Sequence, residues 1–343
     1  MSLSAFFLTN PLQGIPVIFV FGALLIGLYV VVRGADWLVD GSSSIAARWG
    51  IPAIVIGLTV VAFGTSMPEL IVNILSSVTG STGLAIGNVV GSNIANILLI
   101  LGATAVFRSL AVKENTVWKE IPMAFLAMIL LWVMSNDAFL AGAAVNVLDR
   151  IDGFVFLAFF IIFLYYTFGI SKVEGEAPKP EEFPFAASIG LVGLGIGALT
   201  LGGKITVDAA TAFASSVGVS DALIGLTVVA LGTSLPELVT SIAAARKGKA
   251  DLAIGNVVGS NIFNIFWILG VSALIRPLPF DTSSSFDVLV AVAASLLLFI
   301  SLFVRRFLRA PQTVAARHTL GRKRGIIFLI LYVAYIAFAV WRG

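Results

Sequence analysis

The chain contains a long internal repeat. The stretch 57–102 recurs as 225–270, at an offset of 168 positions, and 30 of the 46 aligned residues are identical. Gly-Thr-Ser-x-Pro-Glu occurs at 64–69 and 232–237, and Ala-Ile-Gly-Asn-Val-Val-Gly-Ser-Asn-Ile at 85–94 and 253–262. The similarity extends weakly upstream, where Gly34 and Asp40 match Gly202 and Asp208. A duplication of this size predicts a fold of two related halves.

The composition places both halves in a membrane. Hydrophobic residues make up 59% of the chain, charged residues only 11%, and the mean hydropathy is +1.06, whereas a soluble domain carries about 25% charged residues. A helix needs about 20 apolar residues to cross the hydrocarbon. Ten segments meet this need, at 16–34, 53–78, 84–107, 120–136, 151–170, 184–203, 221–245, 252–275, 286–304 and 325–341.

The position of the repeats predicts their relative orientation. They occupy the second and third segments and then the seventh and eighth, a displacement of five segments, so the second copy must cross the membrane in the opposite direction. We therefore expect an all-α polytopic membrane protein of ten transmembrane helices, arranged as two inverted five-helix halves. The halves are 1–169 and 184–343, and the Pro-rich, charged stretch 170–183 is a solvated cytoplasmic linker.

Basic residues near span ends collect on the cytoplasmic side. If both termini lie outside, 17 of the 21 Lys and Arg residues fall on that side, and only Arg150, Lys204, Arg276 and Arg342 fall outside. This predicts a multi-pass protein of the plasma (inner) membrane, with no removable signal peptide before the first span. The basic run 305–324 is expected to anchor the topology on anionic lipid, with its His318 solvated.

Each repeat carries one glutamate inside an apolar segment, Glu69 and Glu237. An ionisable side chain at mid-membrane costs roughly 2.5 to 3.5 kcal/mol and is a functional candidate by default. Proline stands directly before each glutamate and three residues after Thr65 or Thr233. Because proline lacks an N–H and collides with the carbonyl four residues back, the helix should break there and free carbonyls around the threonines.

The second part of each repeat adds side-chain oxygens. Helical spacing puts Ser92 with Asn96, and Ser260 with Asn264, on one face. Asn88 and Asn256 lie on that face one turn earlier, whereas Asn93 and Asn261 point elsewhere. Carboxylates, amides, hydroxyls and carbonyls suit a hard cation such as Ca²⁺.

Zinc and haem sites built from His or Cys are excluded, because the chain has no Cys and its single His lies outside the repeats. Other small residues are expected to serve helix packing instead, namely Gly193, Gly197, Ser76 and Ser77.

Charge balance suggests how such a site could work. One Ca²⁺, two Na⁺ or two protons would each neutralise two buried carboxylates, so these cations should compete. The residues leave open Ca²⁺/Na⁺ exchange, Ca²⁺/H⁺ exchange and, as a weaker alternative, a passive cation channel or a non-transporting ion sensor. An intramembrane hydrolase lacks a catalytic set, and the nearest approach to a Walker A motif, before Lys204, lacks its first Gly and its Ser or Thr.

The two repeats resemble the alpha-repeats of the cation/calcium exchanger superfamily, in particular prokaryotic sodium/calcium exchangers. The resemblance covers essentially the whole chain and implies that the second, third, seventh and eighth spans hold the ions, while the first and sixth slide past them. It implies Ca²⁺ binding by Glu69 and Glu237 with the backbone of Thr65 and Thr233. For Na⁺ it implies the shared glutamates with Ala62, Ser66, Ser92, Ala230, Ser234 and Ser260.

The central amides carry a further implication of the resemblance. Asn96 matches an asparagine of the family's first repeat, whereas some exchangers, including potassium-dependent ones, have Asp at the position of Asn264. The missing acid weighs against K⁺ co-transport. We thus expect a secondary antiporter and no enzyme, exchanging Ca²⁺ for Na⁺ without a resident cofactor. It should work as a monomer in lipid and bind no nucleic acid.

Overall fold

The computed structural model describes residues 10–114, 116–173, 183–217, 230–308 and 318–342, and almost all of them are helical. The elements of the first half are α2 (Val17–Trp49), α3 (Ala53–Ile56), η1 (Gly57–Val61), α4 (Ala62–Thr65), α5 (Met67–Thr79), α6 (Thr82–Ile94), η2 (Ala95–Leu101), α7 (Gly102–Phe107), β1 (Leu110–Ala111), η3 (Thr116–Glu120), α8 (Ile121–Met134), α9 (Asp137–Ala141), β2 (Asn146–Leu148) and α10 (Arg150–Val173). The segments labelled η are π-helical.

The second half repeats much of this order. Its elements are α11 (Phe185–Ser216), α13 (Ala230–Thr233), α14 (Leu235–Arg246), α15 (Ala250–Ile262), η5 (Phe263–Leu269), α16 (Gly270–Ile275), β3 (Leu278–Phe280), α17 (Thr282–Leu308), β4 (Thr319–Leu320) and α18 (Arg322–Arg342). The strands form two short antiparallel pairs, β1 with β4 and β2 with β3, which join elements of different halves.

Among the described residues, eight helices are long and apolar enough to cross a membrane, and nine if the bent pair 53–65 and 67–79 counts as one span. The seventh expected span, 221–245, begins in residues 218–229, which lie outside the described residues, so this count does not include it. Two spans are central, since 78% of the apolar window is buried in 82–107 and in 250–275, against 39% or less in the other six. The surrounding spans expose apolar side chains, as lipid contact requires.

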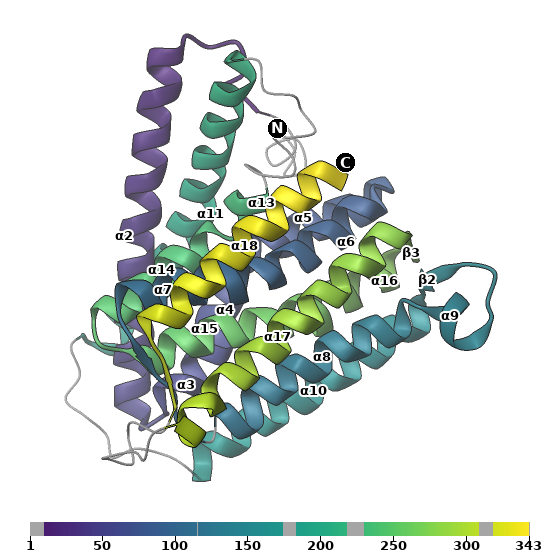
Figure 1. The fold of residues 1–343 in the computed structure, drawn as a ribbon. Coiled ribbons are helices and arrows are strands. Elements are labelled where there is room, and N and C mark those ends of the chain that lie inside the picture. Colours follow the sequence, from purple (N-terminus) through teal and green to yellow (C-terminus); the bar gives the residue numbers. More distant parts are fainter. Residues whose placement is uncertain (1–9, 115, 174–182, 218–229, 309–317, 343) are drawn as a thin grey trace.

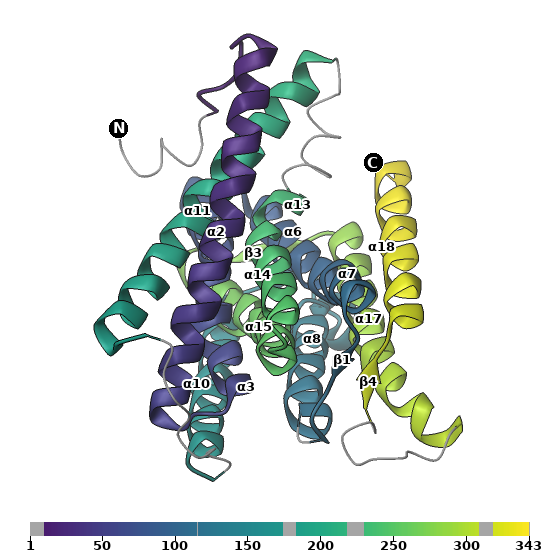
Figure 2. The same cartoon turned by 90° about the vertical axis from the view of Figure 1, so that its left-hand side faces the viewer.

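Helices α2 and α11 are longer than the expected first and sixth spans, which were predicted to end at 34 and 203. They run to Trp49 and Ser216 because the polar residues beyond those points are satisfied within the helix or by neighbours. Ser42 donates to the Leu38 carbonyl, Thr206 to that of Gly202, and Lys204 pairs with Asp208 at 2.7 Å. Figures 1 and 2 show the two helices side by side and tilted against the other helices.

Glycines let the backbones of α2 and α11 touch. A Cβ on Gly34 would lie 2.9 Å from the Leu199 nitrogen, and one on Gly195 would lie 2.7 Å from the Leu38 nitrogen. The packing role predicted for Gly193 and Gly197 is wrong, since no described atom of a neighbouring element lies within 4 Å of a Cβ added at either position. Both lie on other faces of α11, away from Gly195.

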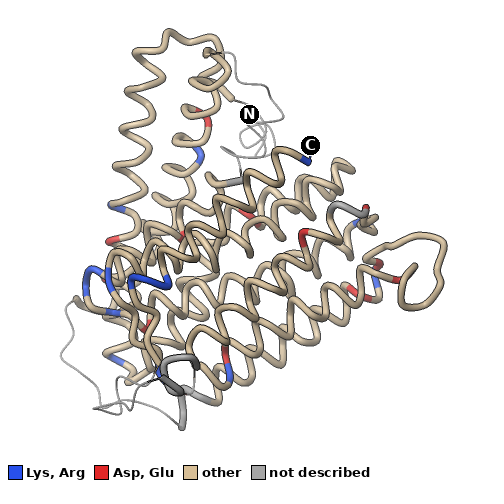
Figure 3. The backbone as a smooth tube through the Cα atoms, viewed as in Figure 1, with Lys and Arg blue, Asp and Glu red and all other residues tan. Residues whose placement is uncertain are grey.

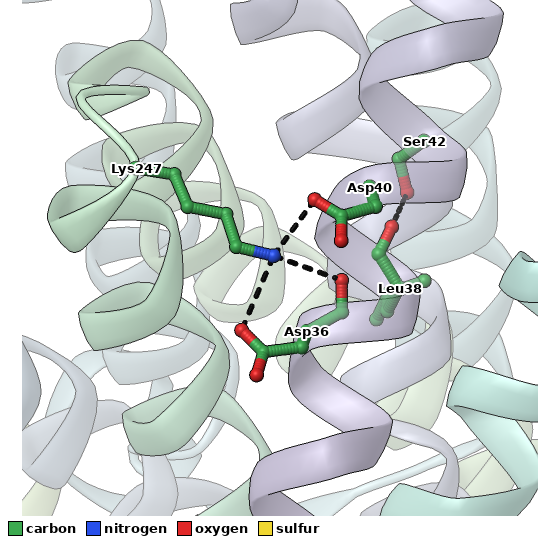
Figure 4. A network of polar contacts seen from close by, with 5 residues as sticks. All are labelled: Asp36, Leu38, Asp40, Ser42 and Lys247. Carbon is green, nitrogen blue, oxygen red and sulfur yellow. Dashed lines mark hydrogen bonds and ion pairs between the residues drawn. The ribbon is translucent and has the colours of Figure 1, made fainter. Parts of the chain in front are cut away.

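A lysine ties α2 to the central helices. Lys247 follows α14, and its Nζ lies 2.7 Å from Asp40 Oδ1, 3.2 Å from Asp36 Oδ1 and 3.3 Å from the Asp36 carbonyl oxygen. Figure 4 shows the ammonium between the two aspartates, which lie one turn apart on α2. The residues of the second half that match Asp36 and Asp40 are Lys204 and Asp208, and these two pair with each other.

His318 is buried, with 2% of its surface exposed, so the prediction of a solvated side chain is wrong. Its carbonyl accepts from the Val112 N–H at 2.9 Å next to the β1–β4 pair, and its Nδ1 lies 3.3 Å from the Leu302 carbonyl oxygen. Strand pairing therefore brings this end of the basic run back onto the helices. Residues 309–317 of the run lie outside the described residues.

Candidate ion-binding site

Both Pro-Glu motifs interrupt their helices, as predicted. Ser66 (φ −84°, ψ 9°) separates α4 from α5, and Ser234 (φ −86°, ψ 1°) separates α13 from α14. The axes of 53–65 and 67–79 differ by 49°. Since each proline stands near the start of the following helix, its missing N–H removes a donor from the carbonyl of the preceding turn. Polar backbone is thus available at the centre of the molecule.

The two glutamates lie in the first turns of α5 and α14, and each is 1% exposed. The amides and positive dipole end of a helix N-terminus favour a carboxylate. Ser92 and Ser260 donate to Glu69 Oε1 and Glu237 Oε1, each at 3.4 Å. Ser66 also donates to Glu237 Oε1, at 2.8 Å, so the two copies meet at this carboxylate.

The serine matching Ser66 is placed differently. Ser234 donates to Ser92 Oγ at 3.3 Å, and not to Glu69. The hydrogen bonds around the two carboxylates are therefore unequal, with one more hydroxyl directed at Glu237.

Threonine and asparagine side chains connect the copies in a matched pattern. Thr65 Oγ1 donates to Asn256 Oδ1 at 2.9 Å, and Thr233 Oγ1 donates to Asn88 Oδ1 at 3.3 Å. Each asparagine uses its Nδ2 on the glutamate backbone of its own copy, Asn88 on the Glu69 carbonyl at 3.5 Å and Asn256 on the Glu237 carbonyl at 3.3 Å. Asn88 and Asn256 thus each contact the helix break of their own copy through Nδ2 and the helix break of the other copy through Oδ1.

The central amides form a second crossed pair. Asn96 donates to Asn261 Oδ1 at 3.0 Å, and Asn264 donates to Asn93 Oδ1 at 3.4 Å. The prediction that Asn93 and Asn261 point elsewhere is therefore wrong. Asn96 and Asn264 lie in the matching π-helical segments η2 and η5, where the wider turn changes the spacing assumed for an α-helix.

Several buried oxygens of these residues have no hydrogen-bond partner among the residues that the structure describes. They are Glu69 Oε2, Glu237 Oε2, Asn96 Oδ1 and Asn264 Oδ1. A buried carboxylate or amide oxygen without a partner is costly, about 1 to 3 kcal/mol or more. Oxygen ligands without nitrogen or sulfur suit Na⁺ or Ca²⁺.

The remaining predicted residues, Ala62 and Ala230, lie in the same short helices as Thr65 and Thr233. Ala62 is fully buried in the first position of α4, and Ala230 begins α13, although its side chain lies outside the described residues. Sequence reasoning missed Asn73 and Ser241, which accept from Asn88 and Asn256 at 2.6 and 3.0 Å. Both stand four residues after a glutamate, and this helical spacing was the available signal.

Known proteins resemble this chain over nearly its whole length. The family model described as sodium/calcium exchanger protein matches residues 19–169 and 187–341. The sodium/calcium exchanger MaX1 of Methanosarcina acetivorans is 33% identical, over 91% of this chain and 96% of that protein. The inner membrane protein YrbG of Escherichia coli is 34% identical, over 93% and 96%.

Solved structures show the same similarity. A structure of the sodium-calcium exchanger NCX_Mj, soaked with Na⁺ and Sr²⁺, superimposes with a TM-score of 0.77 at 36% identity, over 94% of this chain and 99% of that one. The family match covers both halves, and the fold is shared. The chain is a multi-pass membrane protein and belongs to the sodium/calcium exchanger family.

Proposed function

We propose that the chain is a secondary active antiporter that exchanges Ca²⁺ for Na⁺ across the plasma membrane. The observation that carries the proposal is the group of buried oxygens on Glu69, Glu237, Asn96 and Asn264 that have no partner in the described part of the chain. Two of the four belong to carboxylates. The ions are the transported substrates of this site, which we propose to need no resident cofactor.

Electrostatics supplies the exchange rule. A single Ca²⁺ neutralises both carboxylates, and two Na⁺ do the same, but all three ions together would leave an excess positive charge in a site remote from water. For Ca²⁺ we assign the glutamates with the backbone carbonyls of Thr65 and Thr233. For Na⁺ we assign the same glutamates with the oxygens of Ala62, Ser66, Ser92, Ala230, Ser234 and Ser260.

The architecture we propose has ten transmembrane helices in two inverted halves, 1–169 and 184–343, with both termini outside. The crossed hydrogen bonds between matching positions of the two repeats support this arrangement. Figure 3 shows Lys and Arg gathered mainly towards one end of the molecule, which supports a cytoplasmic assignment for that end. Helices α2 and α11 would slide as a pair past the site to alternate access.

Ca²⁺/H⁺ exchange is the alternative function, because a pair of buried carboxylates also binds protons. Sodium is favoured by the hydroxyls of Ser66, Ser92 and Ser260, which meet the carboxylates directly. Protons need no such set of surrounding oxygen ligands. The similarity to NCX_Mj points the same way.

The test is uptake of radioactive Ca²⁺ into proteoliposomes loaded with Na⁺, compared with K⁺-loaded vesicles and with vesicles that carry only an outward H⁺ gradient. We expect uptake only with internal Na⁺. Uptake driven by the proton gradient alone would replace the proposal by Ca²⁺/H⁺ exchange. Uptake that needs no ion on the opposite side would indicate a channel.

A further inference from the structure

Two polar side chains that bear on the site lie one helical turn beyond the glutamates. Asn73 on α5 and Ser241 on α14 occupy matching positions, and both are fully buried. In the described part of the chain, neither side chain is hydrogen-bonded to a glutamate side chain. Their contacts are with Asn88 and Asn256, the amides that connect the two helix breaks.

The contacts of Asn73 form a chain with a fixed direction. Its Nδ2 donates to the Ala85 carbonyl at 3.0 Å, and a carbonyl can only accept. Asn73 Oδ1 must therefore face Asn88, whose Nδ2 donates to it at 2.6 Å. This turns Asn88 Oδ1 towards Thr233, whose hydroxyl donates at 3.3 Å.

The second copy has a matching set of hydrogen bonds, which begins at a serine hydroxyl instead of an asparagine amide. Asn256 Nδ2 donates to Ser241 Oγ at 3.0 Å, and Asn256 Oδ1 accepts from Thr65 at 2.9 Å. A serine hydroxyl can donate or accept. The Glu237 carbonyl can only accept, and it also receives a hydrogen bond from Asn256 Nδ2 at 3.3 Å, so Ser241 Oγ accepts from the same nitrogen and the two acceptors together hold the amide.

We infer that Asn73 and Ser241 are positioning residues of the ion site, which orient the Asn88 and Asn256 amides and through them Thr233 and Thr65. The inference rests on the proposed function, in which the carbonyls of these threonines bind Ca²⁺. An amide that is free to rotate would no longer hold its threonine across the two copies, and the helix break would widen; Thr65 would keep only its contact with the Ala62 carbonyl of its own helix, at 3.3 Å. Ca²⁺ binding should suffer more than Na⁺ binding, since only Ca²⁺ is assigned to these carbonyls.

The experiment measures Na⁺-dependent Ca²⁺ uptake in proteoliposomes for Asn73→Ala, Asn73→Ser and Ser241→Ala. Loss of the part-buried hydrogen bond from Asn88 to Asn73 is worth about 1 kcal/mol, so half-maximal uptake in Asn73→Ala should need roughly five- to tenfold more Ca²⁺. The Na⁺ concentration for half-maximal exchange should change less than about twofold. Asn73→Ser should recover most of the loss, because it supplies the oxygen acceptor found at Ser241.

A double variant separates positioning from general damage. Thr233→Val already lacks the hydroxyl at the end of the chain, so adding Asn73→Ala should raise the Ca²⁺ requirement by less than in the wild-type background. Asn136→Ala serves as control, since it removes a buried amide at the end of α8 that contacts the Trp132 carbonyl. Its Ca²⁺ and Na⁺ requirements should match the wild type.

The outcomes distinguish the two proposals. Absent uptake by the wild type rejects the proposed exchange and this inference with it. Wild-type uptake together with unchanged Ca²⁺ dependence in Asn73→Ala overturns the inference alone, as does equal loss of Ca²⁺ and Na⁺ affinity. If Asn73→Ala does not fold, Ser241→Ala decides, because a hydroxyl deletion is mild and the same selective rise in the Ca²⁺ requirement is expected.

Discussion

At the scale of single residues, the two glutamates carry the only carboxylates among the described site residues. Glu69→Gln or Glu237→Gln keeps the shape of the side chain and removes one negative charge, so a site that needs both charges for Ca²⁺ should lose exchange. We expect Ca²⁺ uptake to fall to background while each purified variant elutes as the wild type does in size-exclusion chromatography. Near-normal uptake by either variant would remove the central role given to the pair.

The unequal serines give a second expectation. Ser66 donates to a carboxylate at 2.8 Å, whereas Ser234 donates to another hydroxyl at 3.3 Å. Hydrogen bonds to charged groups contribute about 1.5 to 3 kcal/mol and neutral ones about 1 kcal/mol. Ser66→Ala should therefore raise the Na⁺ concentration for half-maximal exchange more than Ser234→Ala does. Equal effects in uptake assays would contradict this ranking.

Identity between the copies was the signal that pointed to the candidate site. Glu69, Thr65, Ser92 and Asn96 recur unchanged, so the repeat selected them without structural information. Comparison of the repeats did not select Asn73, because the matching residue of the second copy is Ser241 and the residue types differ. The asymmetry of Ser66 and Ser234 also could not be predicted, since both residues are serine and only packing separates them.

At the scale of elements, the helix breaks at the Pro-Glu motifs could be predicted from the sequence, whereas the lengths of α2 and α11 could not. Pro68 and Pro236 interrupt their helices through a missing N–H, which is a local property of the residue. The extension of α2 depends on Lys247 and on an internal hydrogen bond, and that of α11 on internal contacts alone, none of which hydropathy reports. The π-helical segments η2 and η5 likewise leave no mark in an apolar sequence.

Close contact between α2 and α11 can be tested with glycine substitutions. A side chain at Gly195 would press on the α2 backbone, and overpacking costs about 1 to 3 kcal/mol, so Gly195→Val should lower the thermal unfolding temperature in detergent. Gly193→Val is the matched control on the same helix, where an added Cβ meets no described atom within 4 Å. A similar decrease in both variants would mean that helix propensity, and not contact with α2, accounts for the effect.

The ion pairs between Lys247 and α2 should affect the maximal exchange rate more than the ratio of Ca²⁺ to Na⁺ affinity. A partly exposed ion pair contributes about 0 to 1 kcal/mol, so Lys247→Met should change the maximal exchange rate by up to about fivefold with little change in the ratio of Ca²⁺ to Na⁺ affinity. Lys249→Met is the control, since it removes a nearby positive charge that makes no ion pair with Asp36 or Asp40. High salt should reduce the difference between wild type and Lys247→Met. A changed affinity ratio at constant rate would assign Lys247 to the site instead.

At the scale of the whole molecule, the membrane orientation can be measured directly. The chain contains no cysteine, so a single introduced thiol reports one position. We expect a membrane-impermeant maleimide to label Ala143→Cys in intact cells, because this exposed loop lies on the side assigned as outer. Lys249→Cys should react only after the membrane is permeabilised. The opposite pattern would reverse the orientation and leave the inverted arrangement of the halves intact.

The two halves are alike in sequence, but the contact of Lys247 in the second half with Asp36 and Asp40 in the first has no symmetric counterpart, since Thr79 stands at the position that matches Lys247. In an alternating carrier, such a contact lowers the energy of one resting conformation relative to the other. The apparent affinity for an ion is weakened in proportion to the rarity of the conformation that accepts it. An ion arriving from one compartment and the same ion arriving from the other would then meet different apparent dissociation constants, although both reach the same oxygens.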